Sequence, residues 1–130
     1  MASIFTKIIN GDIPCYKIFE DDKVFAFLDI NPVSKGHTLL IPKVEEDYYF
    51  DLEEDLLAHL SIQSKRISKA IKEVTACGRV GVAVVGLEVP HAHIHLIPID
   101  QMSDFSFAKE KLKLSSEEFE SLAEEIRSRI

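Results

Sequence analysis

Three histidines alternate with other residues in the stretch PHAHIHLIP at positions 90–98. Successive side chains of a β-strand point to opposite faces, so His91, His93 and His95 are predicted to project from one face of a strand. Burying an imidazole is costly unless it finds a hydrogen-bond partner, and packing alone does not favour three of them in a row. The row therefore predicts an active site.

A row of imidazoles can serve in metal ligation, acid–base catalysis or nucleophilic attack. Neighbouring histidines on one face of a strand lie about 7 Å apart and can bind one ion, whereas the outer pair is about 13–14 Å apart. A metal site would need a further ligand, for which Glu88 and His37 are the candidates. Metal ligation stays open as the second choice.

Nucleophilic attack on phosphorus fits the row better. A neutral imidazole attacks through one nitrogen while a hydrogen bond to the other nitrogen fixes its tautomer. His93 has an imidazole on both sides, so it can attack while its neighbours contact a phosphate group and stabilise the charge that develops there.

A second stretch, NPVSKGHTLLIPK at positions 31–43, adds candidates to the same site. His37 opens a predicted strand and shares a face with Leu39. Asp29 ends the preceding strand, where its carboxylate can accept hydrogen bonds from ribose hydroxyls. A turn-forming role before Asn31-Pro32 is the alternative for Asp29.

The elements that must position these residues follow from apolar spacing and turn residues. The pattern predicts a helix at 3–10, a hairpin at 16–20 and 23–30, a strand at 37–43, a helix at 52–77, strands at 80–85 and 91–99, and a carboxy-terminal helix at 116–130. Asp51 with Glu54, and Ser115 with Glu118, predict capping boxes, and Cys77-Gly78 predicts the end of the long helix. Short connections favour an α+β fold, an antiparallel five-stranded sheet with helices on one side, in a single domain spanning 1–130.

Composition excludes several classes of protein. The 130 residues carry a net charge of −7, which argues against broad nucleic-acid binding. No apolar run approaches the about 18–20 residues of a membrane helix, and the amino terminus lacks the features of a secretory signal. Cys15 and Cys77 match no disulfide framework, so we expect reduced thiols and a cytoplasmic protein.

Four stretches of the chain together resemble one known family. The run HAHIHLI matches the histidine triad (HIT) pattern, and FLDINPVSKGHTLLIPK is similar to the upstream signature of that family. The stretches IFTKIINGDIP and IFEDDKVFAF resemble its amino-terminal part, so the similarity covers about residues 3–99. The resemblance, nearest to the phosphoramidase-like nucleotide-binding branch, implies a homodimer whose sheets join. It also implies a hydrolase that cleaves at the α-phosphate of nucleoside 5′-phosphoramidates or related nucleotides.

The resemblance also implies roles for individual residues. His93 is similar to the nucleophile that forms a nucleotidyl-histidine intermediate, His95 to a phosphate contact, and His91 and His37 to groups that orient the nucleophile. Asp29 resembles the ribose-binding carboxylate. Apolar residues that resemble walls of the pocket for a purine base, as in AMP, are Phe5, Ile8, Phe27, Ile30, Leu39 and Val89. Water would resolve the intermediate, with no metal or other cofactor required.

The chain departs from the family pattern at two places. Val85 and Leu87 stand near where relatives carry an asparagine and a glutamine that help to hold the phosphate and the leaving group, and Leu87 cannot donate a hydrogen bond. Ser3 and Thr6 correspond to a C-x-x-C that binds structural zinc in many bacterial relatives. His59 resembles another ligand of that zinc, and we predict no structural zinc here.

Three functional hypotheses follow. The first is a HIT-type hydrolase of purine nucleoside phosphoramidates. The second is a nucleotide-binding module with little turnover, which the residues at positions 85 and 87 motivate. The third is a metal-dependent hydrolase that uses the triad histidines as ligands.

Overall fold

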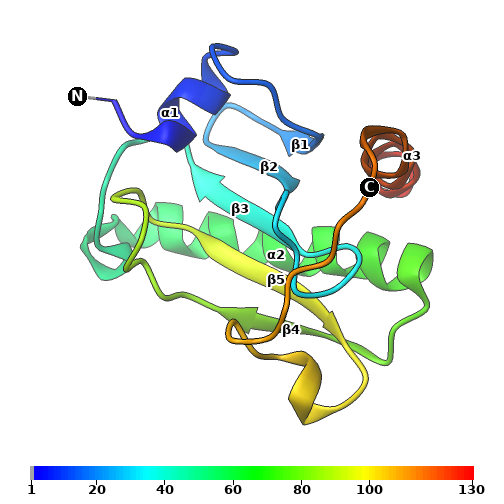
Figure 1. Cartoon of the computed structure of the whole chain (residues 1–130). Helices are drawn as coiled ribbons and strands as arrows, with labels where there is room; N and C mark the ends of the chain where they lie inside the picture. Colours follow the sequence, from blue (N-terminus) through cyan, green and yellow to red (C-terminus); the bar gives the residue numbers. More distant parts are fainter. Residues whose placement is uncertain (1) are drawn as a thin grey trace.

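The structure, a computed structural model, describes residues 2–130. Its elements, labelled in Figure 1, are α1 (Ile4–Ile9), β1 (Lys17–Glu20), β2 (Val24–Leu28), β3 (Thr38–Pro42), η1 (Tyr49–Asp51), α2 (Glu54–Thr75), β4 (Arg79–Ala83), β5 (Ile94–Ile99), η2 (Met102–Asp104) and α3 (Ser116–Arg127). The strands form one antiparallel sheet in the order β1-β2-β3-β5-β4. The predicted α+β class with a five-stranded antiparallel sheet is confirmed.

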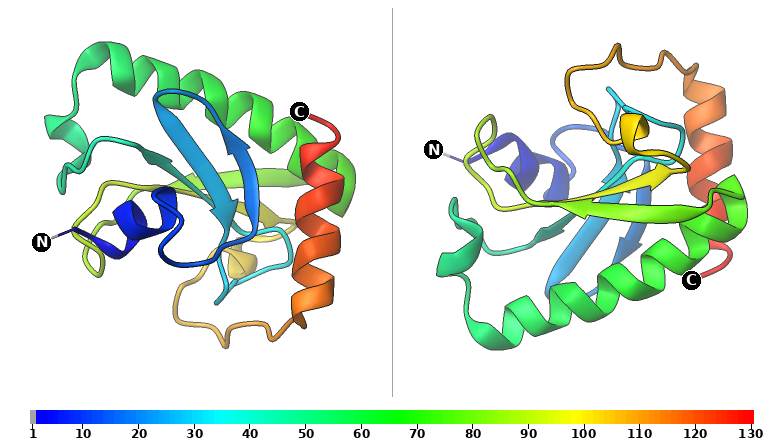
Figure 2. Two further views of the ribbon diagram at one scale, coloured as in Figure 1. Left: turned by 90° about the horizontal axis from the view of Figure 1, so that it is seen from above. Right: turned by 90° about the horizontal axis from the view of Figure 1, so that it is seen from below.

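The two faces of the sheet are covered by different helices. Val24 and Ala26 of β2 belong to the larger core beneath α2 and α3, whereas Phe27 belongs to a smaller cluster with Phe5 and Ile8 of α1. The views in Figure 2 place α2 and α1 on opposite sides of the sheet. The expectation of helices on one side therefore holds for α2 and α3 but is wrong for α1, whose apolar residues cover the aromatic face of β2.

Both predicted ends of α2 are displaced. Asp51 belongs to the 3₁₀ turn η1, and the N-cap is Glu53, whose side chain makes no capping hydrogen bond. At the other end Ala76 adopts a left-handed conformation with φ 58° and donates its N–H to the carbonyl of Lys72. The chain thus leaves the helix two residues before Gly78, and the predicted capping box at Asp51 is wrong.

The carboxy-terminal part follows its prediction more closely. Ser115 and Glu118 form the expected capping box at the start of α3, and the helix ends at Arg127 rather than at residue 130. Between η2 and α3 the chain has no regular structure and passes the β2–β3 turn, where the N–H of Leu112 donates to the carbonyl of Pro32 at 2.9 Å (Figure 1). No helix within residues 2–130 has the length and apolar character needed to cross a membrane.

Candidate active site

The triad histidines line up along one stretch of chain, but only one of them lies in a strand. His95 belongs to β5 and pairs with Leu39 of β3 and Ala83 of β4. His91 and His93 precede the strand in an irregular segment, so the prediction that one strand carries all three is wrong. The rings of His93 and His95 nevertheless lie side by side, with centroids 5.0 Å apart. The ring of His93 therefore lies beside that of His95 although His93 is outside the strand.

Backbone contacts fix the tautomer of His93. Its Nδ1 lies 2.7 Å from the carbonyl oxygen of His91. A carbonyl only accepts hydrogen bonds, so Nδ1 carries the proton and Nε2 carries the lone pair. The side chain is buried, with the ring of Phe5 edge-on at 5.0 Å, and it lines a cavity. Within residues 2–130 the Nε2 atom makes no hydrogen bond, which leaves a nucleophilic nitrogen available to a ligand.

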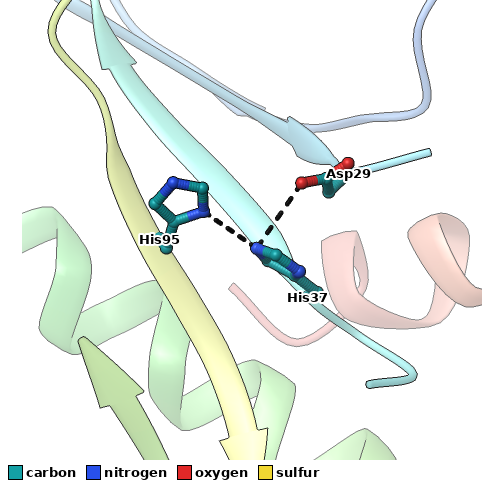
Figure 3. A group of neighbouring side chains, drawn as sticks. All are labelled: Asp29, His37 and His95. Carbon is teal, nitrogen blue, oxygen red and sulfur yellow. Dashed lines mark hydrogen bonds and ion pairs between the residues drawn. The ribbon is translucent and has the colours of Figure 1, made fainter. Parts of the chain in front are cut away.

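His37 and His95 form a hydrogen-bonded pair (Figure 3). The backbone N–H of Val33 donates to Nδ1 of His37 at 3.1 Å, so Nε2 of His37 carries a proton and donates it to Nδ1 of His95 at 3.0 Å. His95 must then carry its own proton on Nε2. Burial lowers the pKa of His37 to about 3 and that of His95 to about 4, and a neighbouring imidazole adds to each effect, His95 for His37 and His93 for His95. At neutral pH both imidazoles are therefore uncharged, and each has one N–H group that can donate a hydrogen bond.

A short turn sets the position of His37 at the start of β3. Gly36 has a φ of +101°, and a Cβ there would lie 2.9 Å from the side chain of Thr75. The residue at this position must therefore be glycine, both for its backbone conformation and for the close packing. The turn brings His37 back beside Asp29, whose N–H donates to the carbonyl of His37 at 3.0 Å.

Asp29 serves the turn and also faces the site. Its Oδ1 accepts the N–H of Asn31 at 2.8 Å, which is the turn-forming contact expected as the alternative role. Its Oδ2 lies 3.5 Å from Nε2 of His37 (Figure 3). Burial raises the pKa of Asp29, against the effect of the Asn31 hydrogen bond. A turn-forming role and a position in the site are therefore compatible for Asp29.

His91 is separated from the cavity and is fully buried. Its Nε2 lies 2.8 Å from the carbonyl of Pro42, so this nitrogen carries the proton. Its Nδ1 accepts the hydroxyl of Ser3 at 2.8 Å. Both ring nitrogens are used, so His91 has no lone pair for a ligand. It acts on the site through its carbonyl, which holds the ring of His93.

The remaining predicted residues surround one cavity of about 480 Å³, a size suited to a small ligand. Of the residues predicted for the site, all except His91 line it: His37, His93, His95, Asp29, Ile30, Phe5, Ile8, Phe27, Leu39 and Val89. Among the lining residues that the sequence analysis did not predict for the site are Phe107 and Lys111. They lie in the irregular segment between η2 and α3, where no motif points to them.

One group of side chains has the composition of a metal site. Potential ligand atoms of Asp29, His37 and His95 all lie within 4.8 Å of one another. The donor set does not fit an ion, however, because the N–H of Val33 occupies Nδ1 of His37 and leaves a proton on the inward-facing Nε2. A metal bound there would have to displace that proton and reverse the tautomer against a fixed backbone donor.

The residues that resemble zinc ligands are engaged elsewhere. The N–H of Ser3 and the hydroxyl of Thr6 both donate to Glu45 at 2.6 Å, and the Ser3 contact is the largest cause that lowers the pKa of Glu45 to about 2. His59 bonds Asp21 at 2.7 Å. Hydroxyl groups are not among the usual ligands of structural zinc, so Ser3 and Thr6 do not fit the ion.

An antiparallel sheet of this order, with alternating histidines beside an apolar cavity, is the architecture of a histidine triad protein. The HIT domain family matches residues 10–102, and the chain belongs to this family. The chain is 38% identical to an uncharacterized HIT-like protein of Borreliella burgdorferi, with 95% of this chain and 94% of that protein covered. It is 36% identical to the adenosine 5′-monophosphoramidase hnt1 of Schizosaccharomyces pombe, over 100% of this chain and 99% of the relative.

Solved structures agree with the sequence relatives. A Hit-like protein from Bartonella henselae, described as involved in cell-cycle regulation, superposes with a TM-score of 0.83. The two proteins are 31% identical, and the match covers 98% of this chain and 96% of that one. The resemblance to the HIT family inferred from the sequence motifs is confirmed.

Proposed function

We propose that the protein is a nucleotide hydrolase that releases AMP from adenosine 5′-phosphoramidates through an intermediate on His93. The observation that carries this proposal is the state of the His93 ring, with Nδ1–H tied to the carbonyl of His91 and Nε2 open to the cavity. Relatives named adenosine 5′-monophosphoramidase support the choice of substrate.

In the first step, Nε2 of His93 attacks the α-phosphorus, a P–N(His) bond forms and the bond to the leaving amine breaks. The amine takes up one proton from solvent as it departs, and the carbonyl of His91 stabilises the cationic imidazolium that forms. Water then attacks the same phosphorus, a P–O bond forms as the P–N bond to His93 breaks, and AMP and the neutral imidazole are released. This step gives one proton back to solvent, so the proton consumed in the first step is replaced in the second.

The neighbouring histidines stabilise the phosphate. Since Nδ1 of His95 accepts from His37, the proton on Nε2 of His95 points the donor end of the pair toward a ligand. A preorganised neutral donor of this kind stabilises the negative charge that builds on the phosphoryl oxygens. We assign the ribose hydroxyls to Asp29 and the purine ring to the apolar wall, which includes Phe27 and Leu39.

The test is release of AMP from adenosine 5′-phosphoramidate, combined with mass spectrometry of the quenched protein. We expect a covalent nucleotidyl adduct on His93 during turnover. His93→Ala should abolish both the adduct and AMP release while the protein stays folded. The matched control is His59→Ala, which removes a histidine on α2 that bonds Asp21 and does not line the cavity. Full activity in His93→Ala would refute the assignment of the nucleophile.

The binding module remains the second candidate because Val85 and Leu87 line the cavity where polar groups would hold the phosphate. Calorimetry with AMP beside the turnover assay separates the two, since tight binding without product release favours the module. The metal-dependent alternative has less support because of the proton on His37. Activity that is lost on chelation and restored by zinc would favour it.

We also propose that two copies of the chain pair through β4. This strand is at the edge of the sheet, and its exposed face and the loop after it present Val82, Val85 and Leu87, which are 59%, 49% and 89% exposed. Unpaired backbone groups beside exposed apolar side chains favour addition of another strand. Sedimentation should give a dimer, and Val82→Lys should give a folded monomer. A wild-type monomer at high concentration would contradict this proposal.

A further inference from the structure

Residues 105–113 form a strap that runs from η2 to α3 along the edge of the candidate active site (orange in Figures 1 and 2). Phe105 packs on Gly81 of β4 so closely that a Cβ there would lie 2.7 Å from the ring. The ring of Phe107 contacts His95, with centroids 4.8 Å apart. Beyond them, the N–H of Leu112 bonds the carbonyl of Pro32. These contacts fix the strap on both sides of Lys111.

Lys111 is held at the mouth of the cavity. Its ammonium donates to the carbonyls of Phe107 and Lys109, the latter at 3.2 Å, and the third N–H has no partner within residues 2–130. Phe107 beside it is 40% exposed, whereas His37 and His93 are 2% and 6% exposed. The strap therefore borders an exposed side of the cavity, whereas His37 and His93 belong to its buried part.

The charges around the cavity are unequal. Among the described lining residues, Lys111 is the one lysine or arginine, and the carboxyl groups of Asp29 and Glu88 line the same cavity. His37 and His95 are neutral at pH 7 because burial lowers their pKa values. A bound nucleotide adds the negative charge of its phosphate. An anionic leaving group would therefore be repelled at this mouth unless Lys111 paired with it.

We propose that Lys111 is a specificity-determining residue that selects nucleotides whose leaving group carries a negative charge, such as the carboxylate of an amino acid. The proposal rests on the hydrolase function proposed above. A group leaving the α-phosphorus must depart from the buried histidines toward solvent, and half-buried Lys111 lines the same cavity, where its ammonium can pair with that group. A contact of Lys111 with the α-phosphate itself would favour all substrates equally, whereas a contact with the leaving group would favour only anionic leaving groups.

The test compares two adenosine 5′-phosphoramidates with leaving amines of similar size and basicity, one made with β-alanine and one with propylamine. Only the first carries a carboxylate. We expect wild-type protein to prefer the β-alanine compound in kcat/KM, and Lys111→Met to lower kcat/KM for that compound by about tenfold while the propylamine compound changes less than twofold. Raised ionic strength should reduce the wild-type preference, because charges at the mouth are screened.

The matched control is Lys113→Met, which removes an exposed lysine of the same strap that does not line the cavity. It should leave the preference unchanged. Equal losses for both compounds in Lys111→Met, or no loss for either, would overturn the proposal. If wild-type protein cleaves neither compound, the hydrolase proposal fails by itself. In that case calorimetry measures the binding of the two intact compounds. Lys111→Met should then weaken binding of the β-alanine compound and leave binding of the propylamine compound unchanged.

Discussion

Removal of one hydroxyl should show how strongly the structure depends on the contacts of His91. Ser3 is 7% exposed, and two contacts of its Oγ matter here: it accepts the N–H of Thr6 as the N-cap of α1, and it donates to Nδ1 of His91, while the hydroxyl of Thr6 lies further away at 3.3 Å. Ser3→Ala removes both. The other nitrogen of His91 must keep its proton for the carbonyl of Pro42, so the ring cannot change tautomer to compensate.

The expected loss of stability is the sum of two effects. Loss of an N-cap costs about 1 kcal/mol. A buried acceptor left without a donor costs about 1–3 kcal/mol, and the hydroxyl of Thr6, at 3.5 Å from Nδ1, is too far away to replace Ser3 without movement. We therefore expect the free energy of unfolding to fall by about 2–4 kcal/mol in Ser3→Ala.

Urea unfolding of three proteins measures the effect: wild type, Ser3→Ala and Ser115→Ala. Ser115 is also an N-cap serine, but its hydroxyl is exposed and accepts the N–H of Glu118 at 3.1 Å. The control should lose about 1 kcal/mol, and the difference between the two variants isolates the bond to His91. If Ser3→Ala costs no more than Ser115→Ala, the buried bond contributes nothing and the argument about His91 is wrong.

Three further predictions concern stability. Because the pKa of His37 is about 3 in the folded protein and about 6.5 when unfolded, the unfolded chain binds the extra proton, so stability is lost as the pH falls from about 6.5 toward 3. Asp29 has a raised pKa and therefore the opposite pH dependence, so the contribution of His37 has to be isolated with the variant His37→Gln. The slope of the free energy of unfolding against pH should be larger in wild type than in this variant, by at most about 1.4 kcal/mol per pH unit. Equal slopes in the two proteins would contradict the prediction. Gly81→Ala should lower the free energy of unfolding by about 1–3 kcal/mol and expose the strap to proteolysis, because the new methyl group would overlap the ring of Phe105. An unchanged melting temperature and digestion pattern would show that the strap is not packed on Gly81. Ala76→Gly should raise the free energy of unfolding by about 1 kcal/mol in urea, because it relieves a left-handed alanine, and a destabilised variant would count against that reason.

Much of the site was predictable because its residues are side chains of unusual type at regular spacing. His93 and His95 stood out by alternation, and His37 by its place at the start of a strand. What alternation could not show is that His91 turns away from the cavity, because this depends on Ser3, which lies 88 positions away in the sequence. Contacts between distant residues of ordinary type leave no local pattern.

The fold shows the same division. The strands were found because apolar residues and turn residues mark them locally. The carboxyl end of α2 was misplaced because the left-handed turn at Ala76 carries no glycine, although glycine usually marks such a conformation. Lys111 was missed because a single lysine in a polar segment is ordinary. Its place at the cavity follows only from the packing of Phe105 and Phe107.

The protonation pattern of the site has one physical source, the backbone. The carbonyl of His91 fixes His93, the N–H of Val33 fixes His37 and through it His95, and the carbonyl of Pro42 fixes His91. Backbone groups do not titrate, so this pattern does not depend on the ionisation of Asp29. It follows that a carboxylate is not needed to hold His93, the proposed nucleophile, in its reactive tautomer. If Asp29 binds the ribose as proposed, replacing it with asparagine should weaken nucleotide binding in calorimetry while leaving the tautomer of His93 unchanged.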